Sequence, residues 1–475
     1  MVQQEFYQLH PVGYETHPEV EEFPLSTIDL TCVCTYNQYG FVFKLDESTD
    51  RTALAQLVRK GLEATLGQCR HLVGTIEKNE ADEYAIVKRR SSVVPFVVQW
   101  MDGPDSQAKS FEEMSRLHFS GKAFGDKTYI GIEGMTFGAP CHLDSSPAVS
   151  GFKLNFIPGG MILCIHHHHY TVDVKGTHSL IIQLAANCKA MFEGTSPPSW
   201  DDAFMDRSLF ITPPPPLADS VEPPPMPQKH PDHKSCYQLI FHLAKSKVAE
   251  IKRMATPTDG SWVSTYDAMI ALWWRISTRT RLDFYPKTNL TSKALFFEAV
   301  TMRHRLRPPL PEQLQANCLN IGRSTQLEER QQLTLAEVMS DEVPLSRLAS
   351  EVRGITDSSN PAFLFDNIKK VANVRDKASL MFRLDSFAPL SFIVTDWRNS
   401  PMCEDDWGFG RPAVFRHLTN HGFEAETIMV VSPPRTVEVD PDEGYEFLIP
   451  FEEHDIEGIL KDPDVVKYFD YRGLQ

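Results

Sequence analysis

Four consecutive histidines, His166 to His169, are the residues of this 475-residue chain that most clearly could do chemistry. An imidazole can bind a metal ion, or it can act as a base near neutral pH because its ordinary pKa is about 6.5. The last histidine also begins an HxxxD pattern that ends at Asp173. The run therefore raises two hypotheses, a metal site and a general base.

The spacing argues against the metal site. Successive side chains of a strand point to opposite faces, so only His167 and His169 could share one face. Two ligands do not complete a site, and the sequence contains neither an HExxH motif nor paired CxxC motifs. We therefore predict no bound metal.

As a general base, His169 would accept a proton from a hydroxyl while that hydroxyl attacks a carbonyl, which typically contributes ~10²–10⁴ in rate. Asp173 could orient the ring or fix the local backbone. A satisfied core histidine is the simpler explanation of HxxxD taken alone. A second short motif, Asp406 to Gly410 (DWGFG), follows late in the chain, and by itself it is typical of a turn.

The elements around the histidines predict an α/β or α+β fold. Gly159 and Gly160 predict a turn that leads into a buried strand over 161–165, and apolar spacing predicts a helix over 180–191. The histidines then lie between a strand and a helix, where α/β proteins commonly place their chemistry. The same patterns predict helices at 52–67 and 264–281 and strands at 296–302 and 390–394.

Composition excludes several classes of protein. The net charge of -16 argues against a broad nucleic-acid-binding face, and the only dense basic cluster lies between Arg303 and Arg307. The first 22 residues lack the pattern of a signal peptide, and no apolar run is long enough to span a membrane. The nine scattered cysteines are expected to be reduced. A soluble, cytoplasmic protein is predicted.

Prolines crowd the stretch between Pro197 and Pro231, and neither a helix nor a sheet can run through it. We interpret it as a crossover at 196–232 between a first domain at 1–195, which carries HxxxD, and a second domain at 233–475, which carries DWGFG. A segment near 365–400 is expected to pack with the first domain.

Taken together and in order, these motifs resemble the BAHD superfamily of acyltransferases. Its fungal branch, which includes trichothecene 3-O-acetyltransferase, is the most similar. The other segments that carry the resemblance are Pro24 to Asp29, Ser264 to Arg275, Arg303 to Pro311 followed by Asn317, and Thr395 to Trp397. The late family motif is usually Asp-Phe-Gly-Trp-Gly, and here its two aromatic residues are exchanged.

The resemblance implies a two-domain, chloramphenicol-acetyltransferase-like architecture, with mixed sheets flanked by helices and a channel at the domain interface. It also implies roles for single residues. His169 would be the general base, and the indole N–H of Trp397 would stabilise the oxyanion. Asp173 would be structural and would pair with Arg303, or alternatively with Arg305.

The remaining roles implied by the resemblance concern support and donor binding. Asn317 would lie near His169, and the loop of Asp406, Gly408 and Gly410 would hold the domains together. Contacts with the acyl donor would come from Ser264, Thr265 and Thr395.

The function expected is transfer of an acyl group, with acetyl favoured, from a coenzyme A thioester to a hydroxyl or amine of a secondary metabolite. Acyl-CoA would be a co-substrate and no cofactor would stay bound. The partners would be that donor and a small acceptor, with no nucleic acid and no membrane, and the enzyme would be a monomer. Two alternatives remain open: a free-standing condensation-type domain that uses a carrier-protein thioester, and a non-catalytic binding protein with the same fold.

Overall fold

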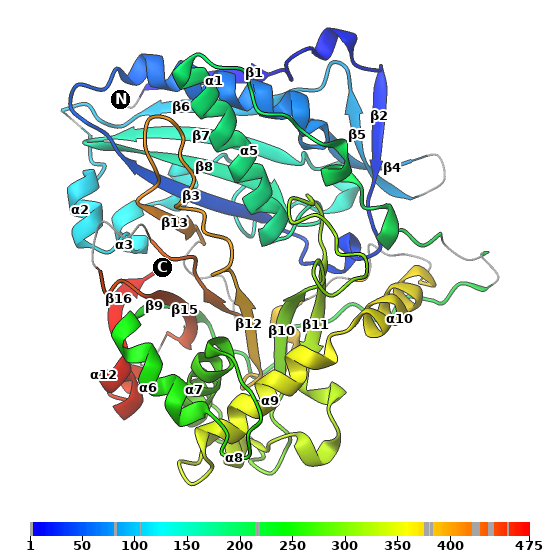
Figure 1. Cartoon of the computed structure of the whole chain (residues 1–475), viewed down its shortest axis with the longest axis vertical. Helices are drawn as coiled ribbons and strands as arrows, with labels where there is room; N and C mark the ends of the chain where they lie inside the picture. The colour runs from blue at the N-terminus through cyan, green and yellow to red at the C-terminus, as the bar shows by residue number, and fades with distance from the viewer. Residues whose placement is uncertain are drawn as a thin grey trace.

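Three β-sheets organise the chain. The computed structural model describes residues 3–79, 83–104, 106–213, 216, 219–374, 380, 383–419, 428–435, 441–453 and 456–475. Within these residues a six-stranded sheet and a seven-stranded sheet lie in the upper and lower parts of Figure 1, and a three-stranded sheet lies beside the first. We call the six-stranded sheet the first sheet and the seven-stranded sheet the second.

The first sheet has the order β1-β6-β7-β8-β3-β13. Strand β8, which carries the histidines, is central and pairs with β7 and β3 in antiparallel register. The β6–β7 pair is parallel, so the sheet is mixed. Its strands are β1 (Gln3–Leu9), β6 (Val94–Trp100), β7 (Ser150–Ile157), β8 (Gly160–His168), β3 (Tyr36–Lys44) and β13 (Val414–His417).

The second sheet has the order β11-β10-β12-β14-β15-β9-β16 and is also mixed, because β10, β12 and β14 run parallel. Its strands are β11 (Leu319–Arg323), β10 (Phe296–Thr301), β12 (Phe392–Asp396), β14 (Ile428–Val431), β15 (Tyr445–Glu452), β9 (Cys236–Leu243) and β16 (Asp470–Leu474). The small sheet consists of β2 (Val20–Pro24), β5 (Tyr84–Arg89) and β4 (Thr75–Lys78).

Helices cover both sheets. On the first sheet α1 and α5 lie against each other (Figure 1), and the approach is close because a Cβ on Gly61 of α1 would stand 2.4 Å from Sγ of Cys188 on α5. On the second sheet α7 packs with α6 and α9. The helices are α1 (Arg51–Gln68), α2 (Phe111–Arg116), α3 (Gly121–Phe124), α4 (Lys127–Ile130), α5 (Val174–Glu193), α6 (Lys245–Ala255), α7 (Thr265–Arg281), α8 (Leu335–Met339), α9 (Leu345–Ser358), α10 (Pro361–Ala372), α11 (Ile456–Leu460) and α12 (Pro463–Tyr468).

The two halves of the chain are interlocked by β13. This late strand pairs with β3 and completes the first sheet, as the orange strand beside the blue β3 in Figure 1 shows. Arg416 on β13 donates a hydrogen bond of 2.7 Å to Glu446 on β15, and both side chains are buried. Gln475 donates its side-chain amide to the carbonyl of His417 and its backbone N–H to Gln238 on β9. Polar contacts therefore join the first sheet to the second.

The elements predicted from sequence are present. The expected helices correspond to α1, α5 and α7, and the expected strands to β8, β10 and β12. Mixed sheets flanked by helices are confirmed as the fold class. The domain limits at 195 and 232 remain a prediction, and so does the packing of a segment near 365–400 with the first domain. Residues 375–379 and 381–382 of that segment lie outside the described residues. The late segment that joins the first sheet is Val414–His417. Among the described residues, no helix combines the length and the apolar character that crossing a bilayer requires.

Candidate active site

His169 lies in the short connection between the central strand β8 and helix α5. Strand β8 ends at His168, and the backbone N–H of His169 still donates to the carbonyl of Thr35 at 2.9 Å. Helix α5 begins at Val174, with Asp173 as its N-cap, whose carboxylate accepts the N–H of Gly176 at 2.8 Å. The HxxxD spacing therefore fits the length of one tight strand-to-helix connection.

The other three histidines of the run are fully buried, whereas His169 is partly exposed. His166 is satisfied inside the first sheet: its Nδ1 lies 2.7 Å from the carbonyl of Met135, and its Nε2 accepts the N–H of Ile132 at 3.1 Å. Both ring nitrogens of His167 are buried without a hydrogen-bond partner among the described residues. Of the four, His169 is therefore the one placed to meet a substrate.

The surroundings of His169 favour the neutral imidazole. Desolvation lowers its pKa below the ordinary value, and the negative charge of Asp173 only partly opposes this. Its Nδ1 is buried and has no hydrogen-bond partner among the described residues. A neutral ring near pH 7 can accept a proton, as a general base must.

Asp173 forms a buried ion pair with Arg303. The two guanidinium contacts measure 2.7 and 2.9 Å, and the backbone N–H of Cys318 donates to the same carboxylate at 2.9 Å. The arginine expected opposite Asp173 is therefore Arg303, while Arg305 instead donates to the carbonyl of Ser359. Because Arg303 comes from the second half, this pair fixes the connection after His169 to that half.

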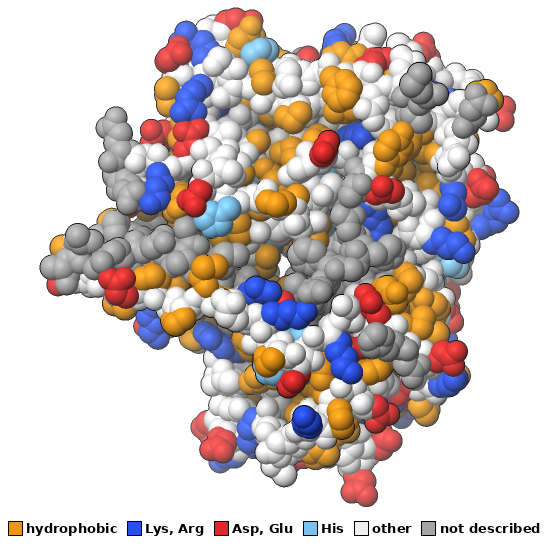
Figure 2. All heavy atoms as spheres, turned by 180° about the vertical axis from the view of Figure 1, so that it is seen from behind, with side chains coloured by type: hydrophobic (Ala, Val, Ile, Leu, Met, Phe, Trp, Pro, Cys, Tyr) orange, Lys and Arg blue, Asp and Glu red, His pale blue; other side chains and the backbone are white. Residues whose placement is uncertain are grey.

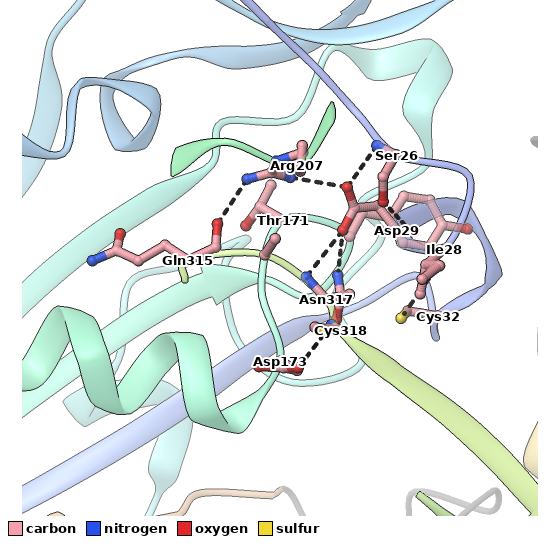
Figure 3. Close-up of polar contacts among 12 residues, drawn as sticks. Ser26, Ile28, Asp29, Cys32, Thr171, Asp173, Arg207, Gln315, Asn317 and Cys318 are labelled. Carbon is pink, nitrogen blue, oxygen red and sulfur yellow. Dashed lines mark hydrogen bonds and ion pairs between the residues drawn. The ribbon is translucent and has the colours of Figure 1, made fainter. Parts of the chain in front are cut away.

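A second buried carboxylate, Asp29, lies near the same connection, close to Thr171 and Asn317 (Figure 3). It accepts hydrogen bonds from Arg207 at 2.9 Å, from the N–H of Ser26 at 2.7 Å and from the side chain of Asn317 at 2.9 Å. The Asn317 amide also donates to the backbone carbonyl of His169 at 3.0 Å. Asn317 therefore lies beside His169, where the resemblance placed it, and Asp29 holds it there.

Sequence reasoning missed Asp29 and Arg207 as site residues. Asp29 ends the Pro24 to Asp29 segment that already carried part of the family resemblance, so a signal was available for it. Arg207 lies in the proline-rich crossover, and no sequence motif around it identifies it as a site residue. Its Nη2 reaches the carbonyl of Gln315, so the crossover contributes to the support of the site.

Trp397 lies at the end of β12 in an aromatic cluster. Its indole N–H donates to the hydroxyl of Thr395 at 3.0 Å, and its ring lies 5.4 Å from that of His417. Burial and, to a smaller extent, the charge of a protonated His169 lower the pKa of His417 to about 3. His417 therefore lies beside Trp397, and sequence reasoning missed it. The predicted oxyanion donor is engaged by Thr395 in this structure.

The DWGFG loop packs on α5. The Asp406 carboxylate accepts hydrogen bonds from the ammonium of Lys189 at 2.8 Å and from the N–H of Gly408 at 2.9 Å, and the N–H of Trp407 donates to the carbonyl of Gly410 at 3.0 Å. Gly408 has a φ of 85°, and a Cβ there would stand 2.8 Å from Cβ of Phe192. A side chain is therefore excluded by both strain and space.

Two residues predicted to bind the donor lie at the start of α7. Ser264 is the N-cap and forms a capping box with Asp267, so its hydroxyl already accepts a backbone N–H. Thr265 is the first helical residue and is partly exposed. Within the part of the chain that the structure describes, neither side chain forms a hydrogen bond with His169, Asp173 or Trp397.

Comparison with known proteins identifies relatives along the whole chain. A family model described as "Transferase family" matches residues 154–465, and one described as "Trichothecene 3-O-acetyltransferase-like N-terminal domain" matches residues 35–188. The chain is 42% identical to Acetyltransferase FGR3 of Gibberella zeae, over 100% of this chain and 95% of that protein.

Solved structures show the same fold. TRI101 of F. graminearum, crystallised with coenzyme A and T-2 mycotoxin, is similar with a TM-score of 0.75 at 19% identity, covering 95% of this chain and 100% of that one. Vinorine synthase is similar with a TM-score of 0.67 at 17% identity, covering 99% of both chains. At these identities the structures establish the fold alone.

Proposed function

The chain belongs to the BAHD transferase family of acyltransferases, and from this premise we propose that it transfers an acetyl group from acetyl-CoA to a hydroxyl of a small secondary metabolite, with His169 as the general base. One observation carries the proposal: His169 is the partly exposed member of the histidine run and stands where contacts from both halves of the chain meet. The acetyl donor is inferred from the name of the 42% identical relative.

In the proposed reaction the acceptor and the thioester meet at His169 in one ternary complex. His169 takes the hydroxyl proton as the oxygen attacks the thioester carbonyl. The tetrahedral intermediate then collapses and expels the thiolate of coenzyme A, which the protonated imidazole can neutralise. Holding both substrates at one ring supplies the orientation that makes the attack effectively unimolecular.

The oxyanion of the intermediate needs a donor, and Trp397 is proposed for that role. During the reaction its N–H would stop donating to the hydroxyl of Thr395 and would donate to the oxyanion instead, because the negative charge makes the oxyanion the stronger acceptor. Asp173, Arg303, Asn317 and Asp29 would act by holding the backbone around His169 and not by touching the substrate.

A screen with purified protein tests the proposal. Acetyl-CoA is incubated with a panel of hydroxylated terpenoids and polyketides, with amines as a second panel, and products are detected by the mass of one added acetyl group. No carrier protein is present, so acetylation also excludes the condensation-type alternative. The His169→Ala variant is expected to lower transfer by ~10²–10⁴.

The matched control for this variant is His142→Ala, because His142 is an exposed histidine outside the run. It is expected to leave transfer unchanged. Full activity of His169→Ala would remove His169 as the base, and transfer only from an acylated carrier protein would replace the function by the condensation-type one.

The finer features of the enzyme belong to the same proposal. We propose a monomer that acts in the cytoplasm without a tightly bound cofactor and binds neither nucleic acid nor membranes. Light scattering of the purified chain and fractionation of cells test the first two. For the donor, Thr265→Ala is expected to raise KM for acetyl-CoA with kcat unchanged if this partly exposed hydroxyl contacts coenzyme A.

A further inference from the structure

Cys34 and Cys141 cluster with His168, the residue that precedes His169. The Sγ atoms of Cys34 and Cys141 lie 4.0 Å apart, and a ring nitrogen of His168 completes a group whose donor atoms all lie within 4.8 Å of one another. Cys34 precedes strand β3, Cys141 lies in the chain before β7, and His168 ends β8. The proposed acyl transfer uses none of the three.

Such a group could hold a metal ion or could be a pair of thiols that oxidises. The ring of His168 decides between them. Its Nδ1 accepts the backbone N–H of Tyr170 at 3.2 Å, so the proton of the neutral ring is on Nε2, which lies 3.3 Å from the carbonyl of Cys141. A histidine that binds a metal through one ring nitrogen usually donates the N–H of the other ring nitrogen to an acceptor. If Nε2 of His168 held a metal, that other nitrogen would be Nδ1, which here accepts a hydrogen bond instead. The donor set is not arranged for a metal.

We propose that Cys34 and Cys141 are a redox-modification site, in which hydrogen peroxide converts the thiol pair into a disulfide. The two residues differ in exposure, because Cys34 is partly exposed and Cys141 is buried. Cys34 is therefore the sulfur that meets the oxidant, and Cys141 resolves the product.

The electrostatics agree with this order of events. The Cys141 thiol as a hydrogen-bond donor lowers the pKa of Cys34, and the neighbouring Cys34 raises the pKa of Cys141. Thiolate is the form of cysteine that reacts with peroxide, and so the partly exposed sulfur is also the activated one.

The reaction balances in two steps. The Cys34 thiolate attacks one oxygen of hydrogen peroxide, the O–O bond breaks, and hydroxide leaves and takes up the proton that Cys34 had lost. The sulfur of Cys141 then attacks the sulfenic acid on Cys34, and the departing hydroxyl leaves as water with the Cys141 proton. Two thiols and one peroxide give one disulfide and two waters.

Disulfide formation would act on His169 through Thr35. This residue follows Cys34, and its carbonyl accepts the backbone N–H of His169 at 2.9 Å. The sulfurs must approach from 4.0 Å to about 2 Å, which draws Cys34 and its neighbour toward Cys141. A displacement of about 1 Å near reacting groups can cost ~10²-fold in rate. This step alone rests on the proposed function, and it predicts that oxidation lowers acetyl transfer at least about tenfold.

The test treats the purified chain with hydrogen peroxide, blocks the free thiols, and digests the protein for mass spectrometry. The expected product is a linked peptide pair that contains Cys34 and Cys141 and has lost two hydrogens, and dithiothreitol should reverse it. Cys34→Ser and Cys141→Ser should each abolish the link and make transfer resistant to peroxide. Cys236→Ser, which alters a buried cysteine on β9, is the matched control and should keep the link.

Several results would overturn the inference. Oxidation of Cys34 to sulfinic acid while Cys141 stays free would show that the pair does not close. One equivalent of Zn²⁺ bound by the untreated chain and lost in Cys34→Ser would make the group a metal site. A complete disulfide with an unchanged transfer rate would refute the coupling to His169. If no acceptor is ever acetylated, the proposed function fails while the linked peptide still reports on the thiol pair.

Discussion

Asn317 donates its side-chain amide to the backbone carbonyl of His169 over 3.0 Å. The two residues are far apart in the sequence and come from different halves of the chain. The same amide nitrogen reaches Asp29 at 2.9 Å, so the backbone of His169 is tied to a buried, charged network. The position of the proposed base therefore depends on the second half of the chain.

Asn317→Ala should weaken catalysis more than folding. The change removes the donor to His169 and leaves the ring less firmly placed, so we expect kcat to fall about 10- to 100-fold with little change in KM. Steady-state kinetics measures this. Asn320→Ala, on the adjoining strand β11, is the matched control and should retain kcat. Equal kcat in the two variants would contradict a positioning role.

Asp173→Asn should destabilise the protein. Arg303 is fully buried, and its two contacts with the Asp173 carboxylate would lose their charge partner. We expect the free energy of unfolding to fall by ~3–5 kcal/mol, measured by urea denaturation. The double variant Asp173→Asn, Arg303→Met removes both charges and should recover part of the loss. A stable single variant would show that the ion pair does not hold the fold.

Trp397→Phe and Thr395→Val separate the oxyanion role from packing. The first removes the indole donor and should lower kcat by ~10²–10³. The second leaves the N–H without its present acceptor and should retain or raise kcat. Stopped-flow measurement of thiol release gives both values. Unchanged kcat in Trp397→Phe would assign the oxyanion to another donor.

The pH dependence of kcat/KM should report the ionisation of His169. Burial lowers its pKa below about 6.5, and only the neutral ring accepts a proton, so activity should be complete at pH 7 and fall at acidic pH with a midpoint under the ordinary histidine value. Asp173 raises this pKa, so Asp173→Asn should move the acid limb to still lower pH. An acid limb centred above the ordinary value would contradict the assignment.

Glu298 should make stability fall as pH rises. Burial raises its pKa to about 7, against about 4.5 for an exposed glutamate. Between these values the folded state binds a proton that the unfolded state has released, so the free energy of unfolding decreases on going from pH 5 to pH 8. Glu298→Gln, which cannot ionise, should remove this contribution, on the order of 2 kcal/mol. Urea denaturation at both pH values tests it, and parallel pH profiles of variant and parent would refute it.

What the sequence determined by itself is local. The short connection from His169 to Asp173 and the start of a helix after Ser264 depend on side chains that reach backbone groups three residues away. The apolar periodicity of α1 and the turn before β8 are local in the same sense. These features could be predicted because the chemistry that forms them lies within one turn of chain.

Only the tertiary structure decided which distant residues support the base. Asp29 and Arg207 are 178 residues apart, and Cys34 and Cys141 are 107 apart, so no spacing pattern connects them. The indole N–H of Trp397 donates to Thr395, which is close to it in the sequence. The orientation of the indole ring, however, is set by its contacts with Tyr39, Phe415 and His417 on the first sheet. Buried charges and rings find their partners through the packing of the two sheets, and that packing is a property of the folded chain as a whole.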